Sequence, residues 1–491
     1  MSAASSLGPL VRVSGGSPFS STCDDLAGQT GTAYVGSEVE PWIDVNPSNP
    51  ANMIGVWQQD RWSNGGSRGL VAGFTTNGGA SWAIGGDLKT SLCTGGTSSN
   101  GGGYQRATDP WVTFGPTGIA YQLSLSFNDL QPPFTTFDFD HALLASRSTN
   151  GGLTWSDPRV VIKDTAPTVF NDKQSITADP TDAAYVYAVW DRLVFPGSER
   201  ASVQASFHSS SFSGPAWFAR SSDSGVSWER PRLIHDPGQR DQTIGNQIVV
   251  QPNGTLVDIF TEFNNENAKK RRGGFVRVLR STDKGSTWSG PFDVGRLGTI
   301  GNFDPETGDP VRTGDIIPDI AVDSTTATPT TGRLYAVWQD ASFNGGREDA
   351  IALSQSLDGG LHWSTPIKIN RTPPGLLGNQ QAFTASVDVS ADGTIAVTYY
   401  DFRSNTSAAS LLTDYFVVHC HPTPTTSCLN PANWMEQQLT TESFDMRQAP
   451  FAGGFFTGDY EGLASAGNAF ATFFSQPHGS DSASVFFRRA G

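Results

Sequence analysis

Ser221-Ser-Asp-Ser-Gly-Val-Ser-Trp228 is one of five copies of a short phrase that recurs along the chain. All five follow the pattern S/T-x-D/N-x-G-x-x-W, and the other four occupy residues 75–82, 148–155, 281–288 and 356–363. The Asp or Asn is expected to cap its own turn by accepting backbone N–H groups, and the Gly supplies a positive φ. The Trp can then bury a large ring against the next sheet. Each copy therefore predicts a hairpin turn followed by an aromatic anchor.

The spacing of these copies predicts the architecture. They lie roughly 60 to 75 residues apart, which is the length of one four-stranded sheet, and short apolar segments between them mark seven units. Helical periodicity is almost absent. We predict an all-β fold, a single seven-bladed β-propeller of four-stranded antiparallel blades over residues 1–491, with six blades as the alternative. The blades are expected to start near residues 40, 109, 173, 245, 317, 381 and 459.

The two ends of the chain are predicted to meet in the last blade. The seventh unit runs out at Ser484–Arg488, so Pro9–Val13 is expected to supply its fourth strand. Residues 1–39 would form this closing strand and an N-terminal loop. Such closure leaves no open sheet edge.

The repeated phrase is similar to the Asp-box (BNR repeat), which occurs in sialidases and in a wider set of glycan-active and glycan-binding β-propellers. The resemblance covers nearly the whole chain. It implies a propeller fold and an oligo- or polysaccharide partner. Asp-boxes are structural turns in proteins of unrelated activity, so the chemistry has to be sought in other residues.

The cysteines indicate an oxidising compartment. Cys420 and Cys428 close a short Pro/Thr-rich loop in the sixth unit, where the turn phrase is missing, and Cys23 and Cys93 would then pair by elimination. The chain opens without a signal-peptide pattern, so the protein is either cytosolic or has lost its signal peptide. We expect secretion, which the low Lys content also favours. Three N-glycosylation sequons point the same way: Asn253, Asn370 and Asn405.

Composition argues against several partners. The formal net charge of −15 disfavours nucleic acid, which needs a basic stripe, and an anionic membrane surface. No apolar run approaches the length of a membrane span. The chain has no zinc-binding pattern and no phosphate loop, so we expect no cofactor. We also expect a monomeric protein. Asp304 and Asp309 are weak candidates for a structural Ca²⁺ site, and an ordinary acidic loop is the alternative.

Strand order predicts which face of the propeller is functional. The repeated phrases and the brief turns between first and second strands fall on one face of a four-stranded meander. The opposite face carries the long segments, where binding and catalysis usually lie. These segments are 85–108, 127–140, 191–215, 235–245, 291–318 and 440–457. The first strands also begin at this face and should bring their charged residues to one funnel, among them Glu40, Asp109, Asp172, Lys173, Asp459 and Tyr460.

Three arginines recur at the ends of second strands: Arg61, Arg192 and Arg403. They could hold a substrate carboxylate bidentately, or each could pair with a neighbouring Asp and order the blade. We expect at least one of them to face the ligand. Asp172, Lys173, Asp401 and Asp459 are the other predicted substrate-binding residues.

The Asp-box resemblance favours a glycoside hydrolase acting on an acidic sugar. By similarity to sialidases, Tyr400 or Tyr460 would be the nucleophile, Glu262 its base and Asp109 the acid, with a pKa raised by burial. Another glycan is an equally open interpretation, because the Phe/Tyr-Arg-Ile-Pro phrase of sialidases is absent.

Two further hypotheses stay open. A polysaccharide lyase acting on a uronic acid would need a base and an acid, and His141 could serve as either, or could be a structural residue paired with Asp140. A non-catalytic propeller that binds glycan or protein is the third hypothesis, since every candidate residue also has a packing role.

Overall fold

The computed structural model describes residues 6–24, 28–128, 140–166, 168–195, 213–265, 272–325 and 330–491. The regular secondary structure of this part is almost entirely β-strand, in antiparallel sets of four strands. Its helical elements are short 3₁₀ turns: η2 (Leu92–Thr94), η3 (Ala341–Asn344), η4 (Pro431–Asn433) and η5 (Met446–Gln448). No described helix is long and apolar enough to cross a lipid bilayer.

Seven strand sets can be followed in the described part of the chain. The first three are β2–β5 (Ala33–Val45, Met53–Trp62, Ser67–Thr75, Ala83–Ile84), β6–β9 (Arg106–Phe114, Ala120–Phe127, His141–Ser148, Arg159–Asp164) and β10–β13 (Val169–Ala178, Val186–Val194, Ala216–Ser221, Arg232–His235). The next three are β14–β17 (Asp241–Val250, Leu256–Asn264, Gly273–Ser281, Ser289–Arg296), β20–β23 (Asp319–Val322, Leu334–Asp340, Ala350–Ser356, Ile367–Lys368) and β24–β27 (Ala382–Val389, Ile395–Asp401, Leu412–Cys420, Met435–Gln438). The last set is β30–β32 (Gly462–Ala466, Ala469–His478, Asp481–Ala490) with β1 (Val11–Arg12).

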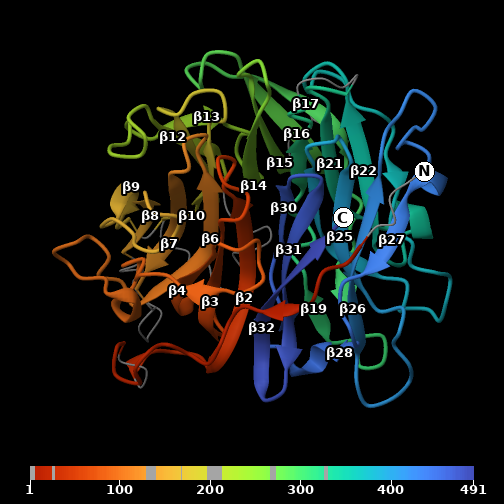
Figure 1. Ribbon diagram of the computed structural model, residues 1–491, viewed down its shortest axis with the longest axis horizontal. Helices are drawn as coiled ribbons and strands as arrows, with labels where there is room; N and C mark the ends of the chain where they lie inside the picture. Colours follow the sequence, from red (N-terminus) through yellow and green to blue (C-terminus); the bar gives the residue numbers. More distant parts are fainter. Residues whose placement is uncertain are drawn as a thin grey trace.

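The sets follow one another around a common centre, so that the last lies beside the first (Figure 1). β2 pairs in parallel with β32 at Ser37 and Ala483. The first strands of all seven sets (β2, β6, β10, β14, β20, β24 and β30) line one cavity of about 580 Å³. Packing the first strand of every set around one axis places their ends together, which is how residues far apart in sequence can meet.

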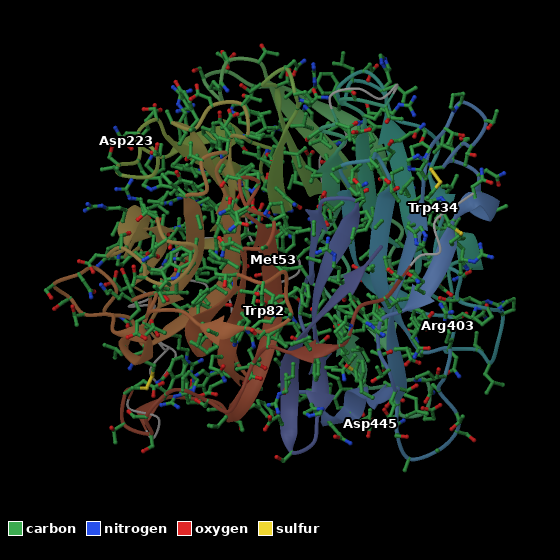
Figure 2. The ribbon with its side chains drawn as sticks, viewed as in Figure 1. Met53, Trp82, Asp223, Arg403, Trp434 and Asp445 are labelled. Carbon is green, nitrogen blue, oxygen red and sulfur yellow. A yellow bond between two sulfur atoms is a disulfide. The ribbon has the colours of Figure 1, made fainter. Side chains whose placement is uncertain are left out.

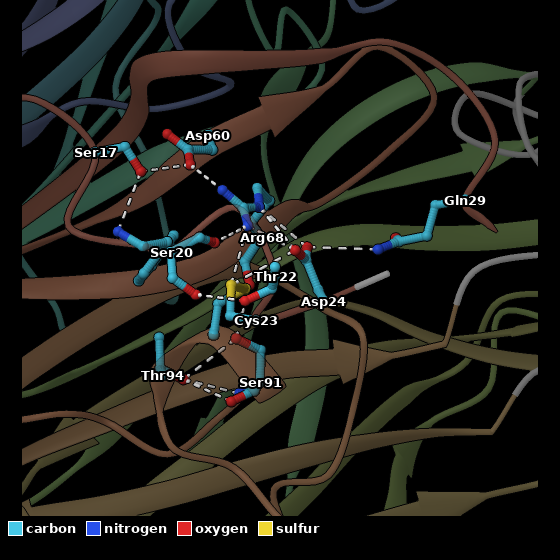
Figure 3. Close-up of a disulfide and its surroundings, with 12 residues drawn as sticks. Ser17, Ser20, Thr22, Cys23, Asp24, Gln29, Asp60, Arg68, Ser91 and Thr94 are labelled. Carbon is cyan, nitrogen blue, oxygen red and sulfur yellow. Dashed lines mark hydrogen bonds and ion pairs between the residues drawn. A yellow bond between two sulfur atoms is a disulfide. The ribbon is translucent and has the colours of Figure 1, made fainter. Parts of the chain in front are cut away.

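The N-terminal segment is fastened at two places. β1 pairs with β32, with Val11 opposite Phe487, which confirms the strand pairing predicted for Pro9–Val13. The disulfide Cys23–Cys93 then ties this segment to the loop after β5. Beside it, the buried Arg68 donates hydrogen bonds to Asp24, Asp60 and the Ser20 carbonyl (Figure 3). The pairing of Cys23 with Cys93 is the one expected from the sequence.

The turn phrases have the predicted capped geometry. In the third copy, Asp223 Oδ1 accepts the Ser227 N–H at 2.9 Å, Ser221 Oγ accepts the Gly225 N–H at 2.9 Å, and Gly225 has a φ of 74°. The hydrogen bond from the Ser227 hydroxyl lowers the pKa of Asp223 to about 2. Figure 2 shows Asp223 at the outer margin of the molecule. The phrase therefore builds hairpins at the periphery.

The tryptophans that end these phrases pack on the neighbouring set. Trp288 of the fourth set contacts Phe218 of the third, with ring centroids 5.4 Å apart. In the sixth set the disulfide Cys420–Cys428 replaces the turn phrase, as predicted, and the buried Trp434 donates its indole N–H to the Cys428 carbonyl (Figure 2). Each anchor thus joins its turn to the body of the sheets.

The turn phrases and the short first turns share one face. Gly78 of the first phrase donates its backbone N–H to Ala51, in the turn between β2 and β3, and Asn52 of that turn donates to the Gly151 carbonyl of the second phrase. Ser224 of the third phrase contacts Ala183 in the same way. The starts of the first strands, at the other end, therefore belong to the long-insertion face, as the strand order predicts.

A three-stranded cap lies on that face. It joins β18 (Asn302–Phe303) and β19 (Pro310–Arg312), from the insertion before β20, to β29 (Phe455–Phe456), from the insertion before β30. The short β28 (Phe444–Asp445) precedes it and pairs with β26. Most of two other predicted long loops, 127–140 and 191–215, lies outside the described residues.

Candidate active site

Bulges in the first strands position the charged residues of the candidate site. β2, β6 and β10 each shift register near their start, after Val39, Thr108 and Asp172. The residues Glu40, Asp109 and Lys173 occupy these bulges with φ values of 51°, 51° and 48°. A positive φ is unfavourable for residues other than glycine, and bulges redirect side chains and occur often beside active sites. Three successive sets therefore present a charged residue at the same place.

Lys173 is the centre of the resulting cluster. Its Nζ lies 2.8 Å from Asp109 Oδ1, 2.7 Å from Asp459 Oδ2 and 3.4 Å from Glu40 Oε1. The four residues come from the first, second and third sets and from the segment that leads into β30. The three carboxylates are buried, and Lys173 is nearly so. We call these four residues, together with Arg312, the carboxylate cluster.

Two arginines enclose the carboxylate cluster from the cap side. Arg312 of β19 holds Asp459 bidentately, through Nε at 2.9 Å and through Nη2. Arg61 of β3 lies 4.8 Å above the Phe456 ring of β29, and Arg312 lies 4.4 Å from the same ring. The cap thus contributes one member of the cluster and covers the rest.

Aromatic rings close the other side of the carboxylate cluster. Trp42 and Trp111 stack with centroids 3.6 Å apart, and Tyr460 meets both rings edge-on. The Tyr460 hydroxyl donates to the Pro110 carbonyl at 3.2 Å, and its ring lies 5.9 Å from Lys173 Nζ. Both tryptophans also line the 580 Å³ cavity, so the aromatic layer separates that cavity from the charged groups.

The carboxylates of this region hold protons differently. Burial raises the pKa of Glu40 to about 7, and it raises that of Asp172, next to Lys173, to about 7. Burial acts against the charge of Asp459 too, but Arg312 and Lys173 hold the pKa of Asp459 well below its usual range. Neutral and ionised carboxyl groups side by side are the arrangement that general acid–base catalysis requires.

Arg61 is the predicted arginine that reaches this region. Its Nη1 donates to Gln58 Oε1, its Nε has no hydrogen-bond partner, and its side chain is 2% exposed. Burial lowers the pKa of Arg61 to about 10. Arg61 is therefore a cation that makes no ion pair with the described residues.

Arg192 and Arg403 lie in pairs elsewhere. Arg192 binds Asp164 of β9 through both terminal nitrogens and lies over the Trp217 ring at 4.7 Å. Arg403 binds Asp401 and Glu436 and lies over Phe416 at 3.7 Å. Figure 2 shows Arg403 well away from the centre of the molecule. Asp401 is held by this pair and by Thr372, so these three predicted residues order the third and sixth sets.

The other predicted catalytic residues are also placed separately. His141 is buried and accepts the Asn171 N–H at 3.1 Å, while Asp140 pairs with Lys163. Glu262 lies between His235 and Arg277 at the rim of the fourth set. Tyr400 is buried and donates to the Ser475 carbonyl at 2.7 Å. The tyrosine that accompanies the carboxylate cluster is Tyr460.

The loop with the predicted calcium ligands is held by an arginine. Asp304 binds Arg447 of η5 through both oxygens, at 2.6 and 2.9 Å, and Arg447 also binds Glu306. Asp309 does not belong to a group of potential metal ligands among the described residues. The one such group found there is Cys23, Asp24 and Cys93, whose two sulfurs form the disulfide. The Ca²⁺ site stays a prediction.

A cleft of about 220 Å³ opens beside the carboxylate cluster on the cap face. Its walls come from the turn after β3, from the insertion that carries β18 and β19, and from residues just before β29. Arg312 lines the cleft and binds Asp459. The cleft therefore reaches the cluster through a single side chain.

Sequence reasoning placed Glu40 in the funnel but gave it no role, and it missed Arg312. The sequence holds a signal for Glu40, since Glu40-Pro-Trp42 and Asp109-Pro-Trp111 are the same phrase in successive units. Arg312 lies in an insertion with no counterpart in the other units, so no repeat pattern could have found it.

Comparison with known proteins gives structural likeness alone. No family model matches the chain, and no curated protein sequence matches it. Similar solved structures include a Hadza microbial sialidase (15% identity, 87% of this chain, 75% of that chain, TM-score 0.47). Another is the Penicillium chrysogenum α-L-arabinanase complexed with arabinobiose (12% identity, 80% of this chain, 94% of that chain, TM-score 0.47). A third is an ulvan lyase of a new polysaccharide lyase family (12% identity, 78% of this chain, 81% of that chain, TM-score 0.45).

Proposed function

We propose that this protein is a secreted enzyme that cleaves a glycosidic bond, built as a single seven-bladed β-propeller of the Asp-box type. The observation that carries the proposal is the carboxylate cluster, in which Glu40, Asp109 and Asp459 meet around Lys173 at the insertion face. The seven strand sets around one cavity and the capped turn phrases support the propeller and the Asp-box assignment. Two disulfides favour an oxidising compartment.

Glu40 is the proton donor in this proposal. A carboxyl group with a pKa of about 7 is still largely protonated at mildly acidic pH, so it can protonate the leaving oxygen. Asp109 supplies the second carboxylate, and Arg312 with Lys173 fixes the charge of Asp459 next to it. The sequence had assigned the acid to Asp109; in this proposal the role goes to Glu40, whose pKa of about 7 supports it.

The spacing of the carboxylates predicts the stereochemical outcome. Asp109 and Glu40 oxygens lie 2.8 and 3.4 Å from the same Lys173 nitrogen, so they cannot be much further apart than those two distances together. Retaining glycosidases place their carboxyl groups about 5–5.5 Å apart, whereas inverting enzymes need about 6.5–9.5 Å for a water molecule. We propose retention of configuration.

Arg61 is the residue proposed to recognise an acidic group. Of the three predicted arginines, it is the one that lies near the carboxylate cluster, and its Nε has no hydrogen-bond partner. A buried guanidinium N–H without an acceptor is costly and is relieved by an incoming oxygen. An acidic sugar therefore stays the proposed substrate at the cleaved bond.

The low exposure of the carboxylate cluster favours a second candidate, a propeller that binds glycan without cleaving it. Lys173 is 9% exposed and the carboxylates 0 to 4%, so a substrate reaches them after the cap moves. If the cap stays closed, the cluster is an internal ion-pair network and the outer cleft is the binding site.

The test is a panel of sialylated, uronate-rich and neutral glycans, read by new reducing ends and by absorbance near ~235 nm, where unsaturated uronates absorb as products of elimination. Reducing ends without that absorbance support hydrolysis, and both together support a lyase. Glu40→Gln should abolish cleavage, while Glu229→Gln, a substitution at a peripheral carboxylate paired with Arg220, should not. Turnover that survives Glu40→Gln unchanged would remove the proposed proton donor.

A further inference from the structure

The cleft beside Arg312 combines an exposed aromatic ring with polar side chains. Phe303 of β18 lines it and is 45% exposed. The polar side chains along its walls are Ser63, Asn64, Asn302, Thr313 and Asp315. We infer that this cleft is a subsite for one neutral sugar ring stacked on Phe303, and this inference rests on the proposed function.

The aromatic wall selects for the face of a sugar. A pyranose or furanose presents C–H groups on one face and hydroxyls around its edge, so its apolar face can cover a phenyl ring while the edge meets polar groups. Phe303 provides the apolar surface, and hydroxyl, amide and carboxylate groups surround it. A flat apolar ligand would leave those polar groups without partners.

The charge of the cleft selects for a neutral ring. Arg312 is the one Lys or Arg among the residues that line it, and its guanidinium is already engaged. Nε and Nη2 bind Asp459, and Nη1 donates to the Ala452 carbonyl at 3.2 Å. A uronate or sialate carboxylate would find no free bidentate fork there and would face Asp315. Hydroxyl groups meet no such repulsion.

The size of the cleft fits a single unit. A cavity of about 220 Å³ is below the ~300 Å³ lower bound of drug-sized ligand pockets, so one ring fits and a chain must extend out of it. Arg312 separates this ring from Asp459 by one guanidinium. The bound sugar is therefore the neighbour of the unit at the carboxylate cluster, and the preferred substrate carries a neutral residue next to the cleaved linkage.

The experiment compares matched neutral and acidic sugars. Methyl galactoside and methyl glucoside are titrated into the protein by calorimetry, alongside the methyl glycosides of galacturonate and glucuronate. The neutral sugars should bind and the uronates should bind more weakly. Phe303→Ala should weaken neutral-sugar binding about tenfold, as expected for loss of one aromatic contact. Ile300→Ala is the matched control, since Ile300 has the same 45% exposure in the same insertion and does not line the cleft.

The outcomes separate this inference from the proposed function. Glycan cleavage with an unchanged KM in Phe303→Ala overturns the subsite and leaves the enzyme. Neutral-sugar binding that is lost in Phe303→Ala, without cleavage of any glycan, supports the subsite and overturns the enzyme. Tighter binding of the uronates overturns the neutral selectivity, and no binding of any sugar overturns the subsite. If Phe303→Ala melts early, Phe303→Leu and Asp315→Asn test the same contacts with smaller changes in packing.

Discussion

Carboxylates lie at both ends of the first strands, and the two ends use them differently. At the insertion face, Asp109 and Asp459 pair with the side chains of Lys173 and Arg312. At the turn-phrase face, Asp388 near the end of β24 accepts the backbone N–H of Ser465 in the next set. Asp44 accepts that of Phe114 in the same way at 2.6 Å.

The difference separates scaffold from site. A carboxylate bound to backbone N–H groups links one set to the next without a charged partner side chain. The pairs at the insertion face need side chains from four separate segments, and the bulges at Glu40, Asp109 and Lys173 hold the backbone in an unfavourable conformation to make them. Backbone strain at the residues of a polar cluster indicates a functional role more strongly than unstrained links to backbone N–H groups do.

The largest expected effect is on activity. Glu40→Gln and Asp109→Asn should each reduce glycan cleavage by about 10²–10⁴-fold, the usual contribution of a general acid or base. Asp388→Asn, at the opposite end of the axis, should leave the rate nearly unchanged, because its partners are backbone groups. Initial rates on the most active glycan measure this. Equal losses in all three variants would erase the distinction between the two ends.

Removing the central cation should have the next largest effect. Lys173→Met leaves three buried carboxylates without their shared partner, which typically costs about 3–5 kcal/mol of folding free energy. Urea denaturation monitored by Trp fluorescence gives the number. A loss below that of Asp388→Ala would show that the cluster contributes less to stability than the backbone links do.

The pH dependence of stability sharpens the comparison. Burial raises the pKa of Glu40 and of Asp388 to about 7, above the usual values of unfolded carboxyl groups. As pH rises, the unfolded chain releases these protons first, so the stability they give is complete in mild acid and is lost as pH rises through about 7. The melting temperature should therefore fall between about pH 5 and pH 8. Glu40→Gln should flatten part of this slope, and a slope identical to that of the unmodified protein would contradict the assignment.

The backbone links should be worth less individually. Asp388→Ala leaves the N–H groups of Val389 and Ser465 without their acceptor, at a cost of about 1–3 kcal/mol. Thermal unfolding of Asp388→Ala measures this cost. Asp388→Asn is the comparison variant, because Asn keeps one acceptor oxygen. Full stability in the Ala variant would mean that water replaces the carboxylate in the cavity.

A peripheral turn should show the smallest effect. Asp223→Ala removes an acceptor from an exposed hairpin and should cost about 0.5–1.5 kcal/mol, without any change in activity. Differential scanning calorimetry with a parallel rate measurement checks both statements. A loss of activity here would connect the turn phrases to the site, which their position at the other face does not predict.

Several residues show where sequence reasoning succeeds and where it stops. Strand order brings Asp109, Lys173, Asp459 and Tyr460 together, because first strands begin at one face around one axis. The same logic fails for Arg192 and Arg403, which end second strands. Arg192 pairs with Asp164 of β9 in the preceding set, and Arg403 pairs with Glu436 of β27 in its own set. Strand order specifies neither partner.

The sequence by itself determined the all-β architecture, the capped turns, both disulfides and the pairing of β1 with β32, because each depends on local residue chemistry at a regular spacing. Only the tertiary structure decided that burial raises the pKa of Glu40, that Arg312 holds Asp459, and that a cap covers the cluster. Burial and charge pairing depend on which segments lie close together in space, and these segments can be separated by almost the whole length of the chain. No local pattern encodes those distances.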